Sequence, residues 1–519
     1  MTQKIVIDPI TRIEGHLKVE VEIEGGKVTN AHASGTMARG LEVLLKGKDP
    51  RDATYVTERV CGVCAGSHGW VSSVAVENAQ GAKLPQAARV LRNLILGAMW
   101  LHDHPLHFYH LSALDYLDVT AVTHYQGKDP KLLAVKDKIV KLVHSGDTSP
   151  LLPRYKPDEF SVNDPDLVTL AVSHYIKALE MQAKAKKMSA IFSGKQPHQS
   201  SIVAGGVTML PDITQIEQFR TLLAEQADFA ENVYWKDVAT FGTGPLLPLA
   251  RAGIGGGYGH YLTYGGFPLA GKGELFFPAG VIFDNRFGNV QPVDQAKITE
   301  AVKYSWYTPA CGTKNPVQGD TVFDLNKPGA YSFIKAPRYD GKPMEVGPLA
   351  RMLVLKPAPF MDIVTKYGIK PGAVARHAAR AYETVLLAKA MPGWLDELEG
   401  YIKQGRTRIH DTEHWDPPAT GAGIGMIDAP RGALGHWVEI ANHKIANYQM
   451  VVPTTWNHSP RDENGQPGPL EQALIGVPVP DPENPNNIVR VVRSYDPCLA
   501  CAIHIIHPES NRVLEFRIG

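Results

Sequence analysis

The sequence has too few cysteines, too little excess charge and too short apolar runs for several broad classes of protein. Five cysteines among 519 residues exclude a disulfide scaffold. Lys plus Arg (53) equal Asp plus Glu (53), which argues against a nucleic-acid binder, because such proteins carry a basic excess. No apolar run approaches the roughly 18 residues that cross a bilayer. The N-terminal MTQKIVIDP lacks the apolar core of an export signal, so we expect the protein to reach a membrane or leave the cytoplasm only with a partner.

The remaining composition, 44% hydrophobic and 20% charged, is that of an ordinary globular protein. The length exceeds the roughly 100–200 residues of a typical domain and predicts two to four packing units. Residues 1–35 predict antiparallel strands, because apolar residues alternate from Leu17 to Ile23 and Gly25-Gly26 supplies a turn.

Long helical patterns dominate the rest of the chain, at residues 85–116, 164–194, 212–241 and 371–403. Asp164 and Pro165 suit the N-cap and first turn of the second pattern, and Pro105 should kink the first. Loops rich in proline and glycine separate the patterns at 242–280, 307–345 and 453–490. We therefore predict a mainly α (α+β) fold, with a central bundle of long helices and a small N-terminal antiparallel β region.

Four of the five cysteines form two C-x-x-C pairs, in RVCGVCAGSH (59–68) and DPCLACAIH (496–504). This spacing lets two thiolates converge on one metal ion. A helical pattern follows Cys64, so the first pair should lie near a helix N-terminus, whose dipole favours the thiolate. Cys311, in a loop between proline and glycine residues, is expected to be an unpaired structural thiol.

Spacing alone leaves several kinds of site open. A four-cysteine zinc site, an iron–sulfur cluster and a redox dithiol all use such pairs. A small zinc module would not need the whole chain to close it, yet Cys64 and Cys498 lie near opposite ends of the chain.

The residues that flank both pairs look like the two signature motifs of the large subunits of nickel-iron hydrogenases. Other blocks resemble that family in the family's order: RIEGH (12–16), RGLE (39–42), HFYHLSALD (107–115), VKYSWY (302–307), KAPRYDGKPMEVGPLARML (335–353), APRGALGHW (429–437) and VVPTTWN (451–457). These blocks span essentially the whole chain, so a chance match is not credible. The resemblance implies a mostly helical fold and reversible oxidation of H2 to two protons and two electrons at a buried nickel-iron site.

The cysteines distinguish this chain from two related kinds of protein. A quinone-reducing subunit shares the fold but lacks them, and a selenium variant has selenocysteine where this chain has Cys498. A non-catalytic subunit, either stapled by a metal or binding a quinone, is the alternative function.

The resemblance implies a ligand set for the metals. Cys61 and Cys498 would be terminal nickel ligands, and Cys64 and Cys501 would bridge nickel to an iron that carries cyanide and carbon monoxide. Soft thiolates suit nickel. A second metal, magnesium, is implied at Glu42, His504 and a backbone carbonyl near Met450. The oxygen ligands suit magnesium, whereas imidazole is less typical of it.

The resemblance also implies roles for residues around the metals. Arg431, which by itself would be interpreted as part of a surface salt bridge, resembles a guanidinium held over the open metal face, where it would act as a base or polarise H2. Asp103 and Asp496 resemble the carboxylates that orient it. The cofactor-binding positions implied around the iron ligands and the cysteine sulfurs are Pro430, Pro453, Thr454 and His68.

Glu14 lies in the RIEGH block. Its position after a β segment alone would predict a solvated side chain, but the block resembles the one that supplies the first proton acceptor beyond the cysteines. Such a glutamate must be partly buried, with a raised pKa. Four nearby histidines are expected to form helix-packing hydrogen bonds rather than a metal site: His102, His104, His107 and His110.

Four of the five cysteines are assigned to the nickel-iron site, so this chain lacks the ligands for an iron–sulfur cluster. The electrons must therefore pass to an iron–sulfur small subunit in a heterodimer. The family's large subunits also depend on nickel-insertion factors and a maturation protease that cleaves after the position of His504. Residues 1–504 are therefore expected to form one catalytic unit, and 505–519 to be a tail that is removed. The expected location is periplasmic or membrane-associated, by export with the small subunit, with a cytoplasmic enzyme as the alternative.

Overall fold

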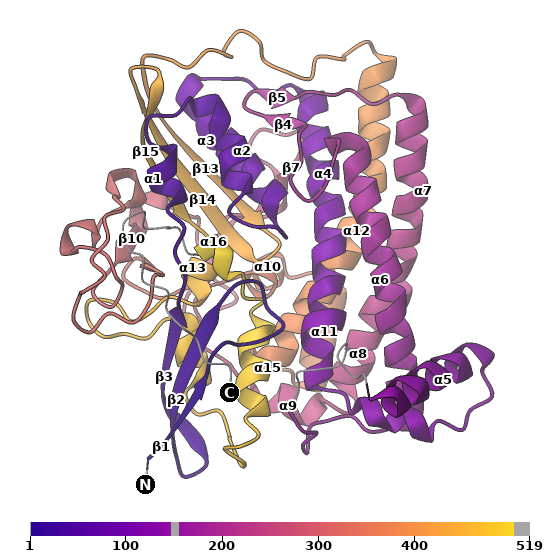
Figure 1. Cartoon of the computed structure of the whole chain (residues 1–519). Coiled ribbons are helices and arrows are strands. Elements are labelled where there is room, and N and C mark those ends of the chain that lie inside the picture. Colours follow the sequence, from indigo (N-terminus) through magenta and orange to yellow (C-terminus); the bar gives the residue numbers. More distant parts are fainter. Residues whose placement is uncertain (1, 147–154, 503–519) are drawn as a thin grey trace.

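The computed structural model of the chain describes residues 2–146 and 155–502, with side chains described as far as residue 500. Four long helices stand side by side in it (Figure 1): α4 (Gln86–Pro105), α6 (Pro165–Ser193), α7 (Ile213–Phe229) and α12 (Ala373–Lys403). Helix α4 packs on α6 and α12, and α7 packs on the same two helices. The predicted central bundle is confirmed.

The helix ends follow from local sequence. Asp164 caps α6, because its side chain accepts hydrogen bonds from the backbone N–H groups of Asp166 and Leu167. Helix α7 begins at a capping box formed by Asp212 and Gln215. At Pro105, α4 gives way to a π-helical turn, η2 (Leu106–Ser112), since proline has no N–H to continue the α-helical ladder.

Two antiparallel sheets flank the bundle (Figure 1). The predicted N-terminal sheet contains β1 (Gln3–Ile7), β2 (Leu17–Glu24) and β3 (Lys27–Gly35). The second, which the sequence analysis did not single out, contains β13 (Thr420–Ala429), β14 (Gly432–Ala441) and β15 (Lys444–Val451).

Glycines explain why the sequence does not show β13 of this second sheet. Helix α3 (Ala65–Gln80) crosses β13 so closely that a Cβ on Gly423 would lie 2.0 Å from the carbonyl oxygen of Ala75, and one on Gly425 would lie 2.2 Å from that of Val71. Alternating glycines are required for this approach, and they erase the alternating apolar pattern that predicts a strand.

Shorter elements complete the fold. The helices are α1 (Leu41–Leu45), α2 (Ala53–Glu58), α5 (Pro130–Ser145), α8 (Trp235–Thr243), α9 (Leu247–Ala252), α10 (Pro348–Leu355), α11 (Ala358–Tyr367), α13 (Pro453–Asn457), α14 (Pro469–Leu474), α15 (Asn486–Ser494) and α16 (Leu499–Ala502). The strands are β4 (Ile202–Val203), β5 (Gly206–Val207), β6 (Tyr261–Thr263), β7 (Gly266–Pro268), β8 (Leu275–Phe277), β9 (Gly280–Ile282), β10 (Ile298–Ala301), β11 (Ala336–Tyr339) and β12 (Glu345–Val346). None of the helices in the described ranges is both long and apolar enough to span a membrane.

Candidate metal centre

Three cysteine side chains meet in the interior. The sulfur atoms of Cys61, Cys64 and Cys498 all lie within 4.8 Å of one another, and each residue is at most 3% exposed. The sulfurs of Cys61 and Cys498 are 3.2 Å apart. Because metal–sulfur bonds are about 2.3 Å long, sulfurs at these separations can share one metal. The backbone of Cys501 lies in α16 on the same segment as Cys498, but its side chain is outside the described part of the chain.

The first pair is held by its own helix. Cys64 is the N-cap of α3, as the sequence predicted. The Cys61 sulfur accepts hydrogen bonds from the backbone N–H groups of Val63, at 3.2 Å, and Cys64, at 3.3 Å. These donors and the positive end of the helix dipole favour the thiolate that a soft metal requires.

Cys498 is held by segments far from it in sequence. The chain beside Glu14 forms a short parallel bridge with it, in which the Leu499 N–H donates to the Glu14 carbonyl at 2.9 Å. The Cys498 N–H donates to the hydroxyl oxygen of Thr454 at 3.0 Å. Gly15, with φ 80°, makes the bridge possible, because a Cβ there would lie 2.7 Å from the Leu499 Cβ.

The Glu14 carboxylate faces the cysteines. Its Oε2 lies 3.2 Å from the Cys498 sulfur and accepts a hydrogen bond of 2.9 Å from the Ala500 N–H. Burial and the negative charge of Cys61 raise the pKa of this carboxyl above its ordinary value. The side chain is partly buried, as the resemblance implied, and a raised pKa is what a proton relay needs.

Arg431 lies in the turn between β13 and β14 and is 3% exposed, so its interpretation as a surface salt bridge is wrong. Its Nη1 lies 3.3 Å from Asp103 Oδ2, and its Nε lies 3.1 Å from Asp496 Oδ1. Burial lowers the pKa of the guanidinium, but Asp496, Cys498 and Asp103 outweigh burial and raise it well above the usual value. The guanidinium is therefore charged and held between two carboxylates.

The family model described as nickel-dependent hydrogenase matches residues 39–504, and one described as HoxL-like matches residues 4–34. The chain belongs to the nickel-dependent hydrogenase family.

Individual relatives agree with this membership. The uptake hydrogenase large subunit of Bradyrhizobium diazoefficiens is 36% identical, over 99% of this chain and 97% of its own. The periplasmic [NiFeSe] hydrogenase large subunit of Desulfomicrobium baculatum is 39% identical, over 98% and 96%. The solved Ni-Fe-Se hydrogenase of D. vulgaris Hildenborough superimposes with a TM-score of 0.86 at 39% identity, over 97% of this chain and 100% of that one.

Membership makes the chain the large subunit of an oxidoreductase that acts on H2, with nickel and iron as its metals and a small subunit as its partner. The mainly helical fold that the resemblance implied agrees with that of the solved hydrogenases.

Glu42 and Met450 of this hydrogenase subunit lie together in the interior. The Met450 N–H donates to Glu42 Oε1 at 2.8 Å, and the hydroxyl of Thr321 donates to the other carboxylate oxygen. Gln449, which accepts a hydrogen bond of 2.9 Å from the Lys335 ammonium, lies beside them. The sequence did not predict roles for Thr321, Gln449 and Lys335, because a polar residue type by itself does not indicate a metal site. His504, the third residue of the implied magnesium site, is outside the described residues.

The other predicted positions lie near the cysteines or at the turn before Arg431. Thr454 and Pro453 are in α13, which contacts α16. The Pro430 carbonyl precedes Arg431 and accepts a hydrogen bond of 2.7 Å from Arg351. His68, in the first turn of α3, has its Nδ1 3.3 Å from the Nε2 of His436, a residue of the APRGALGHW block for which the sequence predicted no role.

Three of the four histidines of α4 and η2 contact neighbouring segments, as predicted, whereas the Nδ1 of His102 lies 2.8 Å from Asp103 of its own helix. His107 Nε2 lies 2.6 Å from the Arg493 carbonyl, His110 Nε2 lies 3.1 Å from that of Tyr175, and His104 Nε2 lies 2.7 Å from Glu383.

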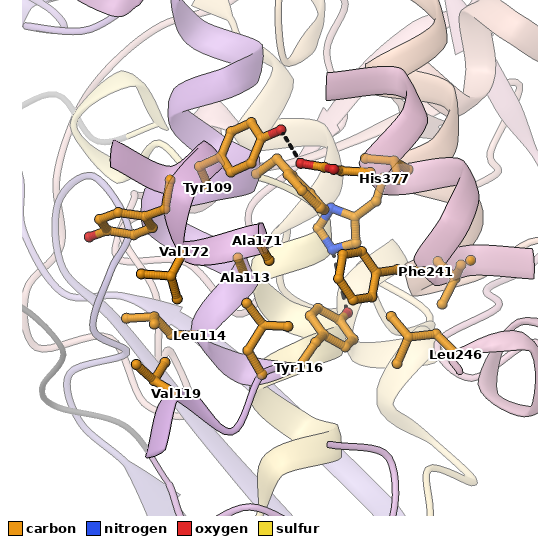
Figure 2. Close-up of a pocket in the computed structure, with 17 residues that line it drawn as sticks. Tyr109, Ala113, Leu114, Tyr116, Val119, Ala171, Val172, Phe241, Leu246 and His377 are labelled. Atoms are coloured by element: carbon orange, nitrogen blue, oxygen red, sulfur yellow. Dashed lines mark hydrogen bonds between the residues drawn. The ribbon is translucent and has the colours of Figure 1, made fainter. Parts of the chain in front are cut away.

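An apolar cavity of about 50 Å³ lies between η2, α6, α8 and α12 (Figure 2). Tyr109, Leu114, Phe241 and His377 are among the residues around it, and the hydroxyl of Tyr109 donates to Asp237 at 2.6 Å. None of the predicted site residues is among its lining residues, so this cavity is separate from the cysteine centre.

Proposed function

We propose that Cys61, Cys64, Cys498 and Cys501 bind one nickel-iron pair and that the enzyme oxidises H2 reversibly there. The observation that carries this proposal is the meeting of three buried thiols, from both ends of the chain, within 4.8 Å. The donor set fits the metals, because thiolates are soft ligands and the N–H groups around Cys61 stabilise its negative charge.

When bound, the metal pair supplies the centre that polarises H2 and takes up its two electrons. Its iron carries cyanide and carbon monoxide in this proposal. Thr454 and the backbone near Pro453 hold the cyanide by donating hydrogen bonds. The geometry of Thr454 supports this role, since its oxygen already accepts from the Cys498 N–H and its own hydroxyl proton remains to be donated.

Arg431 provides a fixed positive charge beside the cysteines. Its pairing with Asp103 and Asp496 sets the direction of the guanidinium fork, and the raised pKa supports a polarising role over that of a base. His68 acts as a hydrogen-bond donor near a bridging cysteine sulfur, in a row of polar side chains that continues through His436 to Tyr448.

Glu14 receives the proton that leaves the cysteines. The distance of 3.2 Å between its carboxylate and the Cys498 sulfur is within hydrogen-bond reach, and no further group has to move for the transfer. The electrons go to iron–sulfur clusters of the small subunit. Since the four cysteines of the centre are occupied by the metals, the chain itself has no ligand set for such a cluster.

Maturation and location complete the proposal. Nickel-insertion factors load the site, and a protease then removes residues 505–519, which lie outside the described residues. Magnesium would be held by Glu42, His504 and a backbone carbonyl near Met450, and would stabilise the C-terminal segment there. The complex is exported with its small subunit and works in the periplasm or at the membrane, in keeping with the periplasmic enzyme named among the relatives.

Hydrogen-dependent reduction of a viologen dye by the purified heterodimer tests this function. The proposal predicts dye reduction under H2 and hydrogen evolution from the reduced dye. A fully assembled heterodimer that does neither would favour the alternative, a non-catalytic metal-stapled or quinone-binding subunit.

A further inference from the structure

Arg351 of α10 is fully buried, and its guanidinium binds two carboxylates and two backbone carbonyls. Its Nε and Nη2 donate to the two oxygens of Glu383 at 2.9 and 2.7 Å. Its Nη1 donates to Asp428 Oδ2 at 2.8 Å and to the Ala429 carbonyl at 3.1 Å, and its Nη2 donates to the Pro430 carbonyl at 2.7 Å. The three residues directly before Arg431 are thus all attached to one side chain.

The carboxylates that hold Arg351 are themselves fixed. Glu383 lies in α12, at 2.7 Å from His104 of α4. Asp428 accepts hydrogen bonds from the Thr263 hydroxyl at 2.9 Å and from the Tyr264 N–H at 2.8 Å. The Trp100 ring of α4 lies 4.5 Å from the guanidinium carbon. Arg351 therefore connects residues 428–430, directly before Arg431, to two long helices of the bundle.

The N-terminus of α10 holds the other side of the same turn. A Cβ on Gly347, which has φ 122°, would lie 2.9 Å from the Arg431 carbonyl oxygen. A Cβ on Gly432, with φ 129°, would lie 2.5 Å from the Gly347 nitrogen. One short helix thus confines the backbone on both sides of Arg431, through contact at Gly347 and through hydrogen bonds at Arg351.

We infer that Arg351 is a positioning residue for H2 oxidation. It holds residues 428–430 so that the guanidinium of Arg431 stays between Asp103 and Asp496 beside the cysteines. This inference rests on the function proposed for Arg431. It assigns two buried arginines different tasks, since Arg431 faces the reacting centre and Arg351 fixes the backbone from which Arg431 extends.

Arg351→Lys tests the inference, because an ammonium keeps the charge but cannot bind both Glu383 oxygens and the carbonyls in one plane. In the purified heterodimer we expect turnover at saturating H2 to fall on the order of 10- to 100-fold, as for a catalytic group displaced by about 1 Å. The KM for H2 and the nickel and iron contents should stay as in the wild type.

Arg92→Lys is the matched control. Arg92 is equally buried, binds both oxygens of Glu77 and donates to the carbonyls of Val203, at 2.7 Å, and Gly206, at 2.9 Å. It binds one carboxylate where Arg351 binds two, and none of its printed partners lies next to Arg431. We expect this variant to lose stability but to keep wild-type turnover per bound nickel.

The double variant Arg351→Lys/Arg431→Lys distinguishes a positioning role of Arg351 from a general loss of structure. If Arg351 acts through Arg431, the double variant is no slower than Arg431→Lys alone, because the effects of coupled residues do not add. The inference is overturned if the double variant shows the product of the two single losses of turnover, or if Arg351→Lys alone keeps wild-type turnover. Either result leaves the proposed function intact. Unchanged turnover in Arg431→Lys refutes the proposed role of Arg431 and the inference with it.

Gly347→Ala tests the same turn if Arg351→Lys fails to assemble. It leaves every buried charge paired but pushes against the Arg431 carbonyl, so we expect a similar loss of turnover. Gly400→Ala, in α12, has open space around its new methyl group and should leave turnover unchanged. Equal turnover in the two glycine variants contradicts the inference.

Discussion

Cys61 and Cys64 are held by the start of their own helix, whereas Cys498 is held by segments from two distant parts of the chain. The backbone N–H groups that bind the Cys61 sulfur come from Val63 and Cys64. The contacts of Cys498 come from Glu14 and Thr454. The hydrogen bonds to the Cys61 sulfur are therefore local, whereas these contacts of Cys498 require the N-terminal and C-terminal segments to dock together.

This difference suggests an order of assembly. Metal can first be bound by the pair at α3 and is then enclosed when the segment of Cys498 and Cys501 closes over it. Changes to this second, docked half and its surroundings should range from complete loss of turnover to faster amide exchange at Cys498 alone.

Cys498→Ser removes the principal thiolate of the docked half. We predict complete loss of H2 turnover with secondary structure retained, as measured by dye reduction and circular dichroism. Cys311→Ser is the control, since Cys311 is equally buried but lies outside the centre, and it should keep nearly full activity. Normal turnover in Cys498→Ser would end the assignment of the nickel site.

Retention of residues 505–519 should also prevent closure of the docked half. We predict that active enzyme ends at His504, and that a chain with the tail is inactive and does not bind its small subunit stably. Intact-mass spectrometry of active heterodimer decides this point. A mass that includes the tail in fully active enzyme would contradict it.

Glu14→Gln keeps the shape of the side chain but removes the carboxyl that cycles a proton. Loss of a positioned proton acceptor costs on the order of 10²- to 10⁴-fold in rate. We therefore predict loss of H+/D+ exchange with solvent and of net turnover, at normal nickel and iron content. Unchanged exchange kinetics would show that another residue is the relay.

Arg431→Lys retains the charge but not the planar fork between Asp103 and Asp496. We expect a loss of turnover on the order of 10²-fold, as when one preorganised donor is removed from an active site. Infrared bands of the metal ligands should change little. A variant within about twofold of wild type, roughly 0.4 kcal/mol of barrier, would remove Arg431 from the mechanism.

Thr454→Val has the smallest expected effect. It leaves the Cys498 N–H without an acceptor, which costs about 1–3 kcal/mol. Hydrogen exchange at the Cys498 amide should accelerate, while exchange in α3 stays unchanged. Thr454→Ser keeps the oxygen and should behave as wild type. If hydrogen exchange accelerates equally at the Cys498 amide and in α3, the two halves of the centre do not form separately.

Local sequence predicted the first half well. The helix after Cys64, the cap at Asp164, the helix that starts after Asp212 and the strands of residues 17–35 all depend on neighbouring residues, and the structure has each of them. The positions of Glu14, Asp103, Arg431 and Asp496 around the cysteines were implied only by family resemblance. No local pattern could show that Arg431 is buried, and its own position favoured a surface salt bridge.

Other features of the structure could not be predicted from the sequence because they depend on tertiary contacts. In the sheet of β13–β15, β13 has glycines that let α3 approach, so this strand lacks the usual apolar alternation. Arg351 lies in a block that resembles the family, yet its significance comes from carbonyls and carboxylates that only the fold brings together.

Elemental analysis of the purified heterodimer tests the central claim most directly. The account predicts that nickel is present in an amount equal to the cysteine centres, that iron exceeds it because the small subunit adds its own, and that Cys498→Ser loses the nickel while Cys311→Ser retains it. Zinc in place of nickel, or no metal at all in a fully folded heterodimer, would contradict the account.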